Sequence, residues 1–248
     1  MRKTILITGA SSGLGEEMAR QFAALGRDLA LCARRTEKLE ALKQEIAQKH
    51  PSVRISIKAL DVKDYDRVFV VFREFAEAFG GLDRVIVNAG MGKGAAIGTG
   101  YFYANRATAE TNFVAALAQC EAAMEIFRKQ NHGHLVMISS VSASRGMPRS
   151  VTTYAATKAG VAALAEGIRA DVLKTPIRVS TIYPGYIRSE INAKVKKTPF
   201  IVDTATGTRA MVKAIEKEVQ NASVPRWPWV PMAFLMRNLP LSVVAKMG

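Results

Sequence analysis

The stretch Thr8-Gly9-Ala10-Ser11-Ser12-Gly13-Leu14-Gly15 carries the clearest information about the fold. It follows the apolar run Ile5-Leu6-Ile7, which is typical of a buried parallel strand, and it precedes a segment with helical periodicity. Gly9 suits a sharp exit from the strand, Gly13 a close approach of backbone to a phosphate, and Gly15 tight packing of helix on strand. The N-terminus of the following helix would point its amides at the same phosphates. A glycine-rich turn in this context predicts a dinucleotide site that includes Ser11, Ser12 and Leu14.

Apolar runs alternate with helical patterns along the whole chain, and this rhythm predicts the fold class. The expected strands are Thr4–Thr8, Asp28–Cys32, Arg54–Leu60, Arg84–Val87, His134–Ser139 and Arg178–Ile182, with a short final strand at Ala222–Pro225. The expected helices are Gly15–Leu25, Glu37–Gln48, Asp64–Phe79, Ala107–Arg128, Thr153–Leu173 and Thr204–Val219. We predict a single α/β domain of the Rossmann type: a doubly wound parallel sheet with helices on both faces. It is expected to occupy residues 1–230, with an apolar and basic extension at residues 231–248.

The end of the second strand indicates which dinucleotide would bind. A carboxylate at this point would accept hydrogen bonds from the ribose of NAD, but the sequence has Cys32-Ala33-Arg34-Arg35. Two guanidinium groups suit a 2′-phosphate, so Arg34 and Arg35 favour NADP(H) over a reading as solvated loop charges. Asp61 and Val62 end the third strand, where the aspartate could meet an adenine edge or cap a helix.

Composition limits the cellular setting. The chain has 248 residues, is 49% hydrophobic and contains two cysteines, Cys32 and Cys120. Two distant cysteines form no disulfide framework, the first strand directly follows the N-terminus without a signal peptide, and no apolar run reaches the roughly 20 residues that span a bilayer. We therefore expect a cytoplasmic protein, with peripheral membrane contact as a second possibility.

Charge points to anionic partners, since the formal net charge is +14. The C-terminal stretch Pro225-Arg226-Trp227-Pro228-Trp229-Val230-Pro231 and the apolar residues after it read as a lid, an oligomer contact or an anchor on an anionic membrane surface. From Arg188 onward ten Lys and Arg stand against four Asp and Glu, which suits anionic lipid or an acidic carrier protein. If the anchor reading holds, deleting Met232–Gly248 should abolish binding to anionic vesicles.

We expect no nucleic-acid role, because helix-turn-helix, zinc-ligand and stacking-aromatic patterns are missing from the sequence, and we predict no metal site.

Tyr154 and Lys158 stand four residues apart and would share one face of a helix. An ammonium beside a phenol stabilises the phenolate and lowers the phenol's pKa, so the tyrosine could exchange a proton near neutral pH. Ser140 and Ser142 follow the fifth strand, where side chains face the ligand crevice of an α/β sheet. Asn112 lies within the preceding predicted helix and could hold a water or a backbone carbonyl in that crevice.

These motifs, in this order, resemble the short-chain dehydrogenase/reductase family over nearly the whole chain. The set comprises the Thr8-to-Gly15 turn, Asn88-Ala89-Gly90 after the fourth strand, Asn112, Ser140, Tyr154 with Lys158, and Pro184-Gly185 after the sixth strand. The resemblance implies Tyr154 as general acid and base, Ser140 as a hydrogen-bond partner of the substrate oxygen, and Lys158 on the nicotinamide ribose. It further implies that Asn112 positions a proton-relay water, that Asn88 holds cofactor and sheet, and that Ile187 and Ser189 meet the carboxamide. A homodimer or homotetramer is also implied.

The gap from Ser140 to Tyr154 is one residue longer than the family's usual gap, so Ser142 is an alternative to Ser140. We favour Ser140, with the extra residue in the Arg149–Thr153 turn, and Ser189 stands where a threonine is common. The function we predict is NADPH-dependent reduction of a carbonyl to an alcohol, or the reverse reaction. A 3-oxoacyl-carrier reductase and a non-catalytic NADP(H)-sensing protein are the alternatives. The loops Met91–Tyr103, Ala143–Val151 and Tyr186–Phe200 are expected to form a lipophilic substrate pocket, with Met91, Met147, Tyr186 and Phe200.

Overall fold

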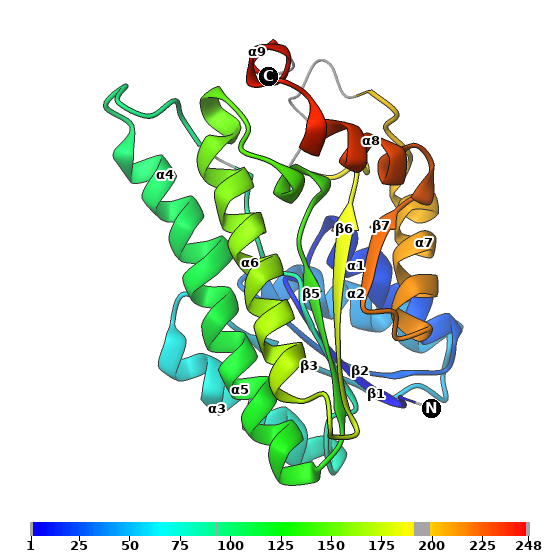
Figure 1. Ribbon diagram of the computed structural model, residues 1–248. Coiled ribbons are helices and arrows are strands. Elements are labelled where there is room, and N and C mark those ends of the chain that lie inside the picture. Colours follow the sequence, from blue (N-terminus) through cyan, green and yellow to red (C-terminus); the bar gives the residue numbers. More distant parts are fainter. Residues whose placement is uncertain (1, 93, 191–198, 247–248) are drawn as a thin grey trace.

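The computed structural model describes residues 2–92, 94–190 and 199–246, and in this part seven strands form one parallel sheet (Figure 1). The strand order is β3-β2-β1-β4-β5-β6-β7. The strands are β1 (Thr4–Thr8), β2 (Asp28–Ala33), β3 (Ile55–Ala59), β4 (Arg84–Val87), β5 (Gly133–Ile138), β6 (Ile177–Pro184) and β7 (Asn221–Val224). The chain moves from β1 outward to β3 and then returns to place β4 on the other side of β1. Ligands bind at such a switch point, at the carboxyl ends of the strands.

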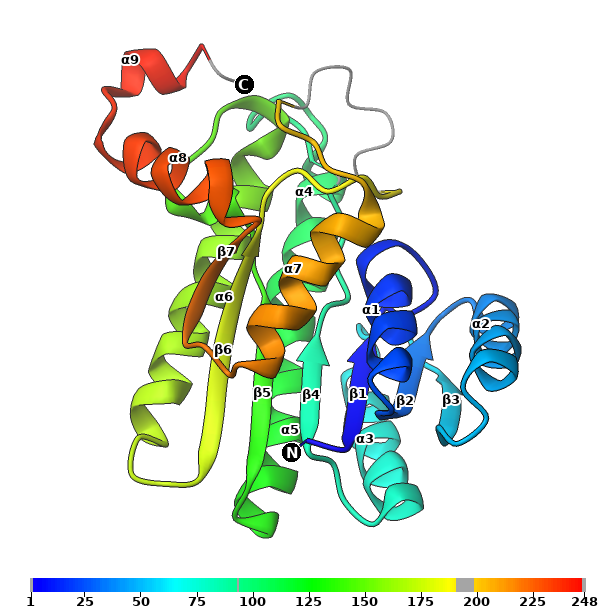
Figure 2. The same ribbon diagram turned by 90° about the vertical axis from the view of Figure 1, so that its right-hand side faces the viewer.

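Helices cover both faces of the sheet, as predicted (Figure 2). One face packs against α1 (Gly13–Ala24), α2 (Thr36–Lys49) and α7 (Thr204–Glu216), and the other against α3 (Tyr65–Phe79), α5 (Ala115–Gln130) and α6 (Thr152–Asp171). Strand β1 shows why the sheet needs two layers: its five residues are all buried, with Leu6 in one hydrophobic cluster and Ile5 and Ile7 in the other. The predicted Rossmann-type fold in a single domain is confirmed.

The long helix expected at Ala107–Arg128 is not continuous. It consists of α4 (Phe102–Ala109), a π-helical turn at Glu110–Val114 and α5. A π-helical turn inserts an extra residue into a helix and is common at functional sites. The hydrophobic period alone does not reveal it, because the flanking turns keep the same buried face.

Strands β1 and β4 have the predicted bounds, and the other boundaries differ from the prediction by at most three residues. Strand β6 extends to Pro184, so this proline ends the strand rather than following it. The short final strand is present at Asn221–Val224. The turn before α6 contains a 3-10 helix at Arg149–Val151, in which Arg149 has a left-handed backbone (φ 60°).

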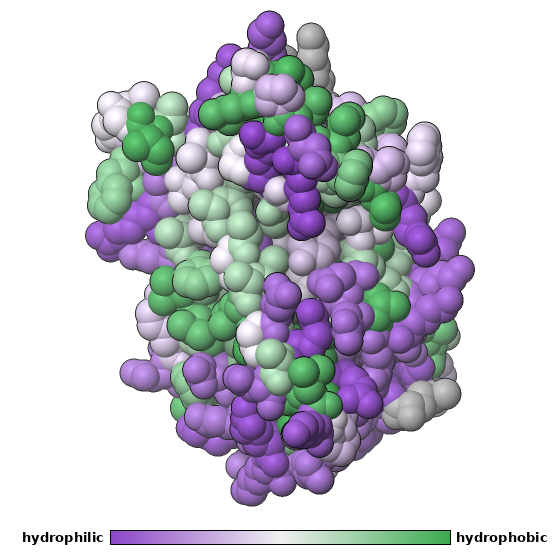
Figure 3. Space-filling model, viewed as in Figure 1, coloured by the Kyte–Doolittle hydropathy of each residue, from purple (hydrophilic) through white to green (hydrophobic). Residues whose placement is uncertain are grey.

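Two further helices, α8 (Arg226–Asn238) and α9 (Leu241–Val244), lie beyond the carboxyl ends of the strands. Helix α8 contains a kink at Trp227 and runs across the expected division between residues 230 and 231. Arg145 ties it to the 3-10 helix Val141–Ser144 by donating to the carbonyls of Met236 and Leu239. Apolar residues gather over α8 and α9 at the top of the space-filling view (Figure 3).

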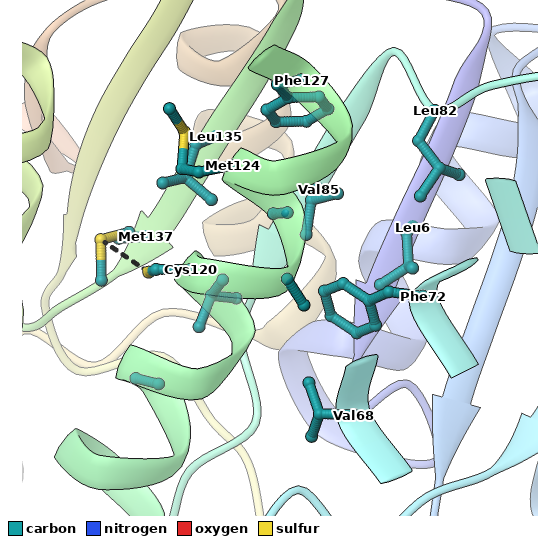
Figure 4. Close-up of a cluster of buried hydrophobic side chains, with 14 of the residues drawn as sticks. Leu6, Val68, Phe72, Leu82, Val85, Cys120, Met124, Phe127, Leu135 and Met137 are labelled. Carbon is teal, nitrogen blue, oxygen red and sulfur yellow. Dashed lines mark hydrogen bonds between the residues drawn. The ribbon is translucent and has the colours of Figure 1, made fainter. Parts of the chain in front are cut away.

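The core between the sheet and helices α3 and α5 is formed by aliphatic, aromatic and sulfur-containing side chains (Figure 4). Phe72 and Phe127 are fully buried there, and the Cys120 thiol contacts the Met137 sulfur at 3.6 Å. No helix among the residues that the structure describes combines the length and apolar character that crossing a bilayer requires.

Candidate active site

The glycine-rich turn packs directly against the segment that follows β4. Gly9 has a left-handed backbone (φ 66°), and a Cβ on it would lie 2.9 Å from Ala89 Cα. A Cβ on Gly15 would lie 2.5 Å from the Gly9 carbonyl oxygen and 2.6 Å from Asn88 Nδ2. Both positions therefore exclude larger residues, and the turn leads directly into the N-terminus of α1.

Thr8 and Asn88 hold this turn in place. The Thr8 hydroxyl accepts hydrogen bonds from the backbone amides of Asn88 and Ala89, both at 3.1 Å. The Asn88 side-chain amide donates to the Thr8 carbonyl at 2.9 Å. Asn88 thus joins the ends of β1 and β4, which are the two strands at the switch point. Leu14 packs on the core of the α1 face, and Gly13 begins α1 close to Ser189.

Beside the turn, Ser11, Ser12, Arg35 and Lys38 lie together around the carboxylate of Glu190, and we call these four residues the anion-binding cluster. Arg35 donates to the hydroxyls of Ser11 at 3.3 Å and Ser12 at 2.6 Å. The carboxylate of Glu190 forms ion pairs with Arg35 at 3.0 Å and with Lys38 at 3.3 Å. Hydrogen bonds from these cations and from Ser12 lower the pKa of Glu190 to about 2. Arg34 is exposed and has no side-chain partner within residues 2–92, 94–190 and 199–246.

The predicted proton-transfer residues come together at the carboxyl end of β5. Ser140 forms a hydrogen bond with the Tyr154 hydroxyl, while Ser142 Oγ donates to Ser140 Oγ at 3.0 Å. Ser140 is therefore the serine that contacts Tyr154, and Ser142 supports Ser140. The Lys158 ammonium lies 5.9 Å from the centroid of the Tyr154 ring and donates to the Ile138 carbonyl at 2.8 Å.

The pKa of Tyr154 differs in direction from the sequence expectation. Burial raises it above the ordinary value and outweighs the hydrogen bond with Ser140, which lowers it. The expected lowering by Lys158 is absent from this structure, in which its ammonium lies 5.9 Å from the ring centroid and donates to the Ile138 carbonyl. Burial also lowers the pKa of Lys158 to about 8.

Asn112 lies in the π-helical turn and is almost fully buried. Its carbonyl oxygen accepts from the Met91 amide at 2.8 Å, and its amide donates to the Met91 carbonyl at 2.9 Å. A Cβ on Gly90 would lie 3.2 Å from Asn112 Oδ1 and 3.6 Å from Lys158 Nζ. Asn112 therefore holds a backbone segment next to Lys158, as one sequence reading proposed, while its role on a water stays a prediction.

The remaining predicted cofactor residues surround the same edge of the sheet. Asp61 accepts from the Lys63 amide at 3.0 Å in a local turn, and Val62 is buried in the core. Pro184 pairs with Val224 at the end of β6. The Ile187 side chain is buried against α7, close to Gly207. Contacts of Ile187 and Ser189 with a carboxamide stay predictions.

An aromatic cluster lies beyond the carboxyl end of β6, where the sequence predicts part of the substrate pocket. Trp229 of α8 is buried, and the rings of Tyr186 and Phe200 pack edge-on against it with centroid distances of 5.5 and 6.3 Å. A Cβ on Gly185 would lie 2.0 Å from Trp229 Nε1, so the indole rests on the glycine backbone. The expected loop Tyr186–Phe200 contains residues 191–198, which lie outside the described part of the chain.

Comparison with known proteins identifies the family. The sequence pattern of the family described as short chain dehydrogenase matches residues 3–199. The chain belongs to the short-chain dehydrogenase family. It is therefore an oxidoreductase that takes a nicotinamide cofactor.

Proteins similar to this short-chain dehydrogenase cover nearly all of its length. An uncharacterized oxidoreductase of Mycobacterium tuberculosis is 55% identical over 239 residues, covering 96% of this chain and 94% of the relative. The structure of a short-chain dehydrogenase from Sphingobium yanoikuyae in complex with NADPH is 26% identical, with a TM-score of 0.80 and coverage of 96% of each chain. A short-chain dehydrogenase from Streptomyces avermitilis is 25% identical, with a TM-score of 0.82, covering 100% of this chain and 95% of that one.

Two features of this short-chain dehydrogenase escaped the sequence reasoning. The first is the ion pair between Lys38 and Glu190 beside Arg35, in which 152 residues separate the two partners. Only Lys38 could have been found from the local sequence, because it follows Arg35 by three residues. The sequence places Trp229 in a lid, an oligomer contact or a membrane anchor, and it does not predict the packing of Trp229 on Gly185. Pro184-Gly185 ends one strand and the Trp-rich segment follows the next strand along the chain. This arrangement is the sequence signal that could have suggested the contact between Gly185 and Trp229.

Proposed function

We propose that this oxidoreductase reduces the carbonyl group of a lipophilic ketone or aldehyde with NADPH, and catalyses the reverse oxidation when the alcohol and NADP are supplied. The observation that carries the proposal is the hydrogen-bonded pair of Ser140 and Tyr154 beside Lys158, at the switch point of the sheet. The glycine-rich turn lies at the same edge.

The residues of the turn fit a dinucleotide. Gly9 and Gly15 leave no room for a Cβ, and the amides at the start of α1 are positioned to bind a pyrophosphate. We assign the 2′-phosphate to the anion-binding cluster of Ser11, Ser12, Arg35 and Lys38, with Arg34 as an exposed further cation. The Glu190 carboxylate on Arg35 and Lys38 supports this assignment, because it is an anion held where a phosphate group would be held.

The cofactor, when bound, supplies the hydride that reduces the carbonyl carbon. Ser140 donates a hydrogen bond that orients the substrate oxygen. Tyr154 transfers its proton to this oxygen as the hydride arrives, so that the product is the neutral alcohol and the phenolate remains. Lys158 is mainly protonated at neutral pH because its pKa lies near 8, so its positive charge faces the Tyr154 ring, 5.9 Å from the centroid, when the phenolate forms. In the reverse direction the phenolate takes the proton from the alcohol.

A lipophilic substrate is favoured by the side chains around the crevice. Tyr186, Phe200 and Trp229 form an apolar wall on one side. On the other side a hollow of about 380 Å³ is lined by residues 96–98, 100–102, 105, 106 and 109 together with Thr153, next to Tyr154.

Incubating the purified protein with a panel of aliphatic and aromatic ketones and following NADPH absorbance tests the proposal. We expect consumption of NADPH and slower consumption of NADH. Tight binding of NADPH without turnover of any ketone or aldehyde would favour a cofactor sensor. Equal or faster use of NADH would contradict the assignment of the 2′-phosphate.

A further inference from the structure

Exposed apolar side chains are concentrated at the end of the molecule where the crevice opens. Of 17 large hydrophobic residues exposed in the described part of the chain, twelve lie in residues 97–103 and 227–243 or are Tyr186 and Phe200. We call these residues the crevice end. They follow β4, β6 and β7, and therefore lie at the same edge of the parallel sheet.

The most exposed members project from separate elements. Trp227 is 78% exposed and Phe234 73% exposed on α8, Leu241 is 68% exposed on α9, and Phe102 is 73% exposed at the start of α4. Figure 1 places α8, α9 and the start of α4 at the upper end of the molecule, and Figure 3 shows apolar residues there beside hydrophilic ones. Exposed side chains of this size on neighbouring elements mark an interaction surface.

The charge of the surrounding chain indicates the kind of partner. Residues 225–246 contain Arg226, Arg237 and Lys246 and no Asp or Glu, and residues 91–109 and 139–165 also lack acidic residues. Arg226, Arg237 and Lys246 are exposed. Two acidic residues lie between β6 and α7: Glu190 is paired with Arg35 and Lys38, and Asp203 caps α7 by accepting from the Thr206 amide.

We propose that the crevice end docks on an anionic lipid surface. Aromatic and aliphatic side chains among cations are the composition of interfacial segments, in which rings enter the headgroup region and cations meet anionic lipids. A second copy of this chain fits less well, because two such ends would bring cations together without opposing carboxylates. Docking in this orientation would open the crevice toward the bilayer.

Co-sedimentation with phosphatidylcholine vesicles, with and without phosphatidylglycerol, tests this surface. We expect the protein to bind the anionic vesicles, and to release them at high salt because surface electrostatics are screened. The double variant Trp227→Ser, Phe234→Ser should lower the partition coefficient by about tenfold or more, since each side chain loses apolar burial in the bilayer.

The matched control is the double variant Leu25→Ser, Leu173→Ser. These leucines are 49% and 68% exposed and lie at the opposite end, before β2 and after α6. The control should bind vesicles as the unchanged protein does, and both variants should bind NADPH normally, which shows that they are folded.

Three results would overturn the proposal. The first is absence of binding of the unchanged protein to anionic vesicles, including the case in which it binds an acidic carrier protein instead. The second is equal loss of binding in the two double variants. The third is a change of oligomeric mass in Trp227→Ser, Phe234→Ser with unchanged vesicle binding, which would identify a second copy as the occupant. None of these measurements depends on turnover, so they stand apart from the proposed reaction.

Discussion

Glu190 forms ion pairs with Arg35 and Lys38, the two cations that we assign to the 2′-phosphate of the cofactor. Its carboxylate is ionised at neutral pH because its pKa lies near 2. Replacing Glu190 by Gln removes a competing anion. An exposed ion pair contributes up to about 1 kcal/mol, so NADPH should bind about two- to fivefold more tightly to this variant. Lys38→Gln should weaken NADPH binding by a similar factor and leave NADH binding unchanged. Titration of protein fluorescence with each nucleotide measures both effects.

Glu37→Gln is the control for these variants, because Glu37 is an exposed residue in the first turn of the same helix α2. It should leave the affinities for both nucleotides unchanged. If Glu190→Gln binds NADPH no better than the unchanged protein does, Glu190 is not a competitor for the phosphate site.

At the level of single residues, the sequence predicted the set Ser140, Tyr154, Lys158 and Asn112, and the structure brings these four together. Local spacing predicted the pair of Tyr154 and Lys158, and the strand end predicted Ser140 or Ser142. The resemblance to the short-chain dehydrogenase/reductase family supplied the roles of Ser140 and Asn112. The direction of the Tyr154 pKa could not be predicted, since it depends on burial by segments distant in sequence. For the same reason Glu190 was not recognised as a partner of Arg35.

Gly185 follows the end of strand β6 and contacts the indole of Trp229 in helix α8. A Cβ at this position would overlap the Trp229 indole, which is buried among Tyr186 and Phe200. Gly185→Ala should therefore displace Trp229 and lower the free energy of unfolding by about 1–3 kcal/mol, the usual cost of overpacking. Denaturant unfolding measures the loss, and a shift in tryptophan emission reports the exposure of the indole. Gly146→Ala is the control, because a Cβ there meets nothing within 4 Å. An equally stable Gly185→Ala with unchanged emission would disprove the packing argument.

The elements at the opposite edge of the sheet are joined by a buried polar chain. Arg84 Nε donates to His134 Nδ1 at 2.9 Å, so Nε2 carries the proton of the neutral ring and donates to Ser180 Oγ at 2.8 Å. Ser180 in turn donates to the Val219 carbonyl. This chain connects β4, β5 and β6 with the segment before β7. Burial, together with the charges of Arg84 and Arg2, lowers the pKa of His134 well below 6.5.

His134 should make stability depend on pH. Below pH 6.5 the unfolded chain binds a proton at this residue and the folded chain does not, so its contribution is complete above pH 6.5 and is lost progressively as the pH falls toward the folded pKa. The slope from one such group is at most about 1.4 kcal/mol per pH unit. Denaturant unfolding between pH 7 and 5 should show this decline in the unchanged protein and in the control His132→Gln, at an exposed position. His134→Gln should show a flatter profile, and a profile as steep as that of the unchanged protein would refute the assignment.

At the level of elements, the sequence predicted the strands and most helices, because continuous apolar runs and the 3.6-residue period are local signals. It did not predict the π-helical turn at Glu110–Val114, and it ended strand β6 at Ile182, two residues before the observed end at Pro184. Both depend on tertiary contacts: Asn112 is held by Met91, and the end of β6 is held by pairing with β7. The role of the Trp-rich segment was left open for the same reason.

The whole molecule has two different ends. The edge of the sheet at the amino ends of the strands holds the buried chain of Arg84, His134 and Ser180. The carboxyl edge holds the glycine-rich turn, the anion-binding cluster and the Ser140–Tyr154 pair. The alternation of strand and helix was enough to predict a site at the carboxyl edge, because parallel strands place all their carboxyl ends at one edge, but it did not predict the buried polar chain at the other edge. What the crevice end contacts could not be predicted from the alternation, since α8 and α9 lie outside it.

A ligand that binds at the carboxyl edge should stabilise the whole domain. NADPH at about 100 times its dissociation constant adds about 2.7 kcal/mol to the free energy of unfolding. For a domain of this size we expect a rise in Tm of about 5–10 °C, to be measured by differential scanning calorimetry. NADH at the same concentration should give a smaller rise, and equal rises would contradict the preference for NADPH.

The most direct test of the account is the rate of NADPH-dependent ketone reduction by Tyr154→Phe. We predict a fall in kcat of about 10²- to 10⁴-fold, the usual contribution of a positioned general acid, with the affinity for NADPH unchanged. Tyr183→Phe, which removes a hydroxyl that contacts Asn221 on the outer strands, should retain its activity. If Tyr154→Phe reduces the ketone as fast as the unchanged protein, the phenol of Tyr154 is not the proton donor and the proposed reaction is wrong.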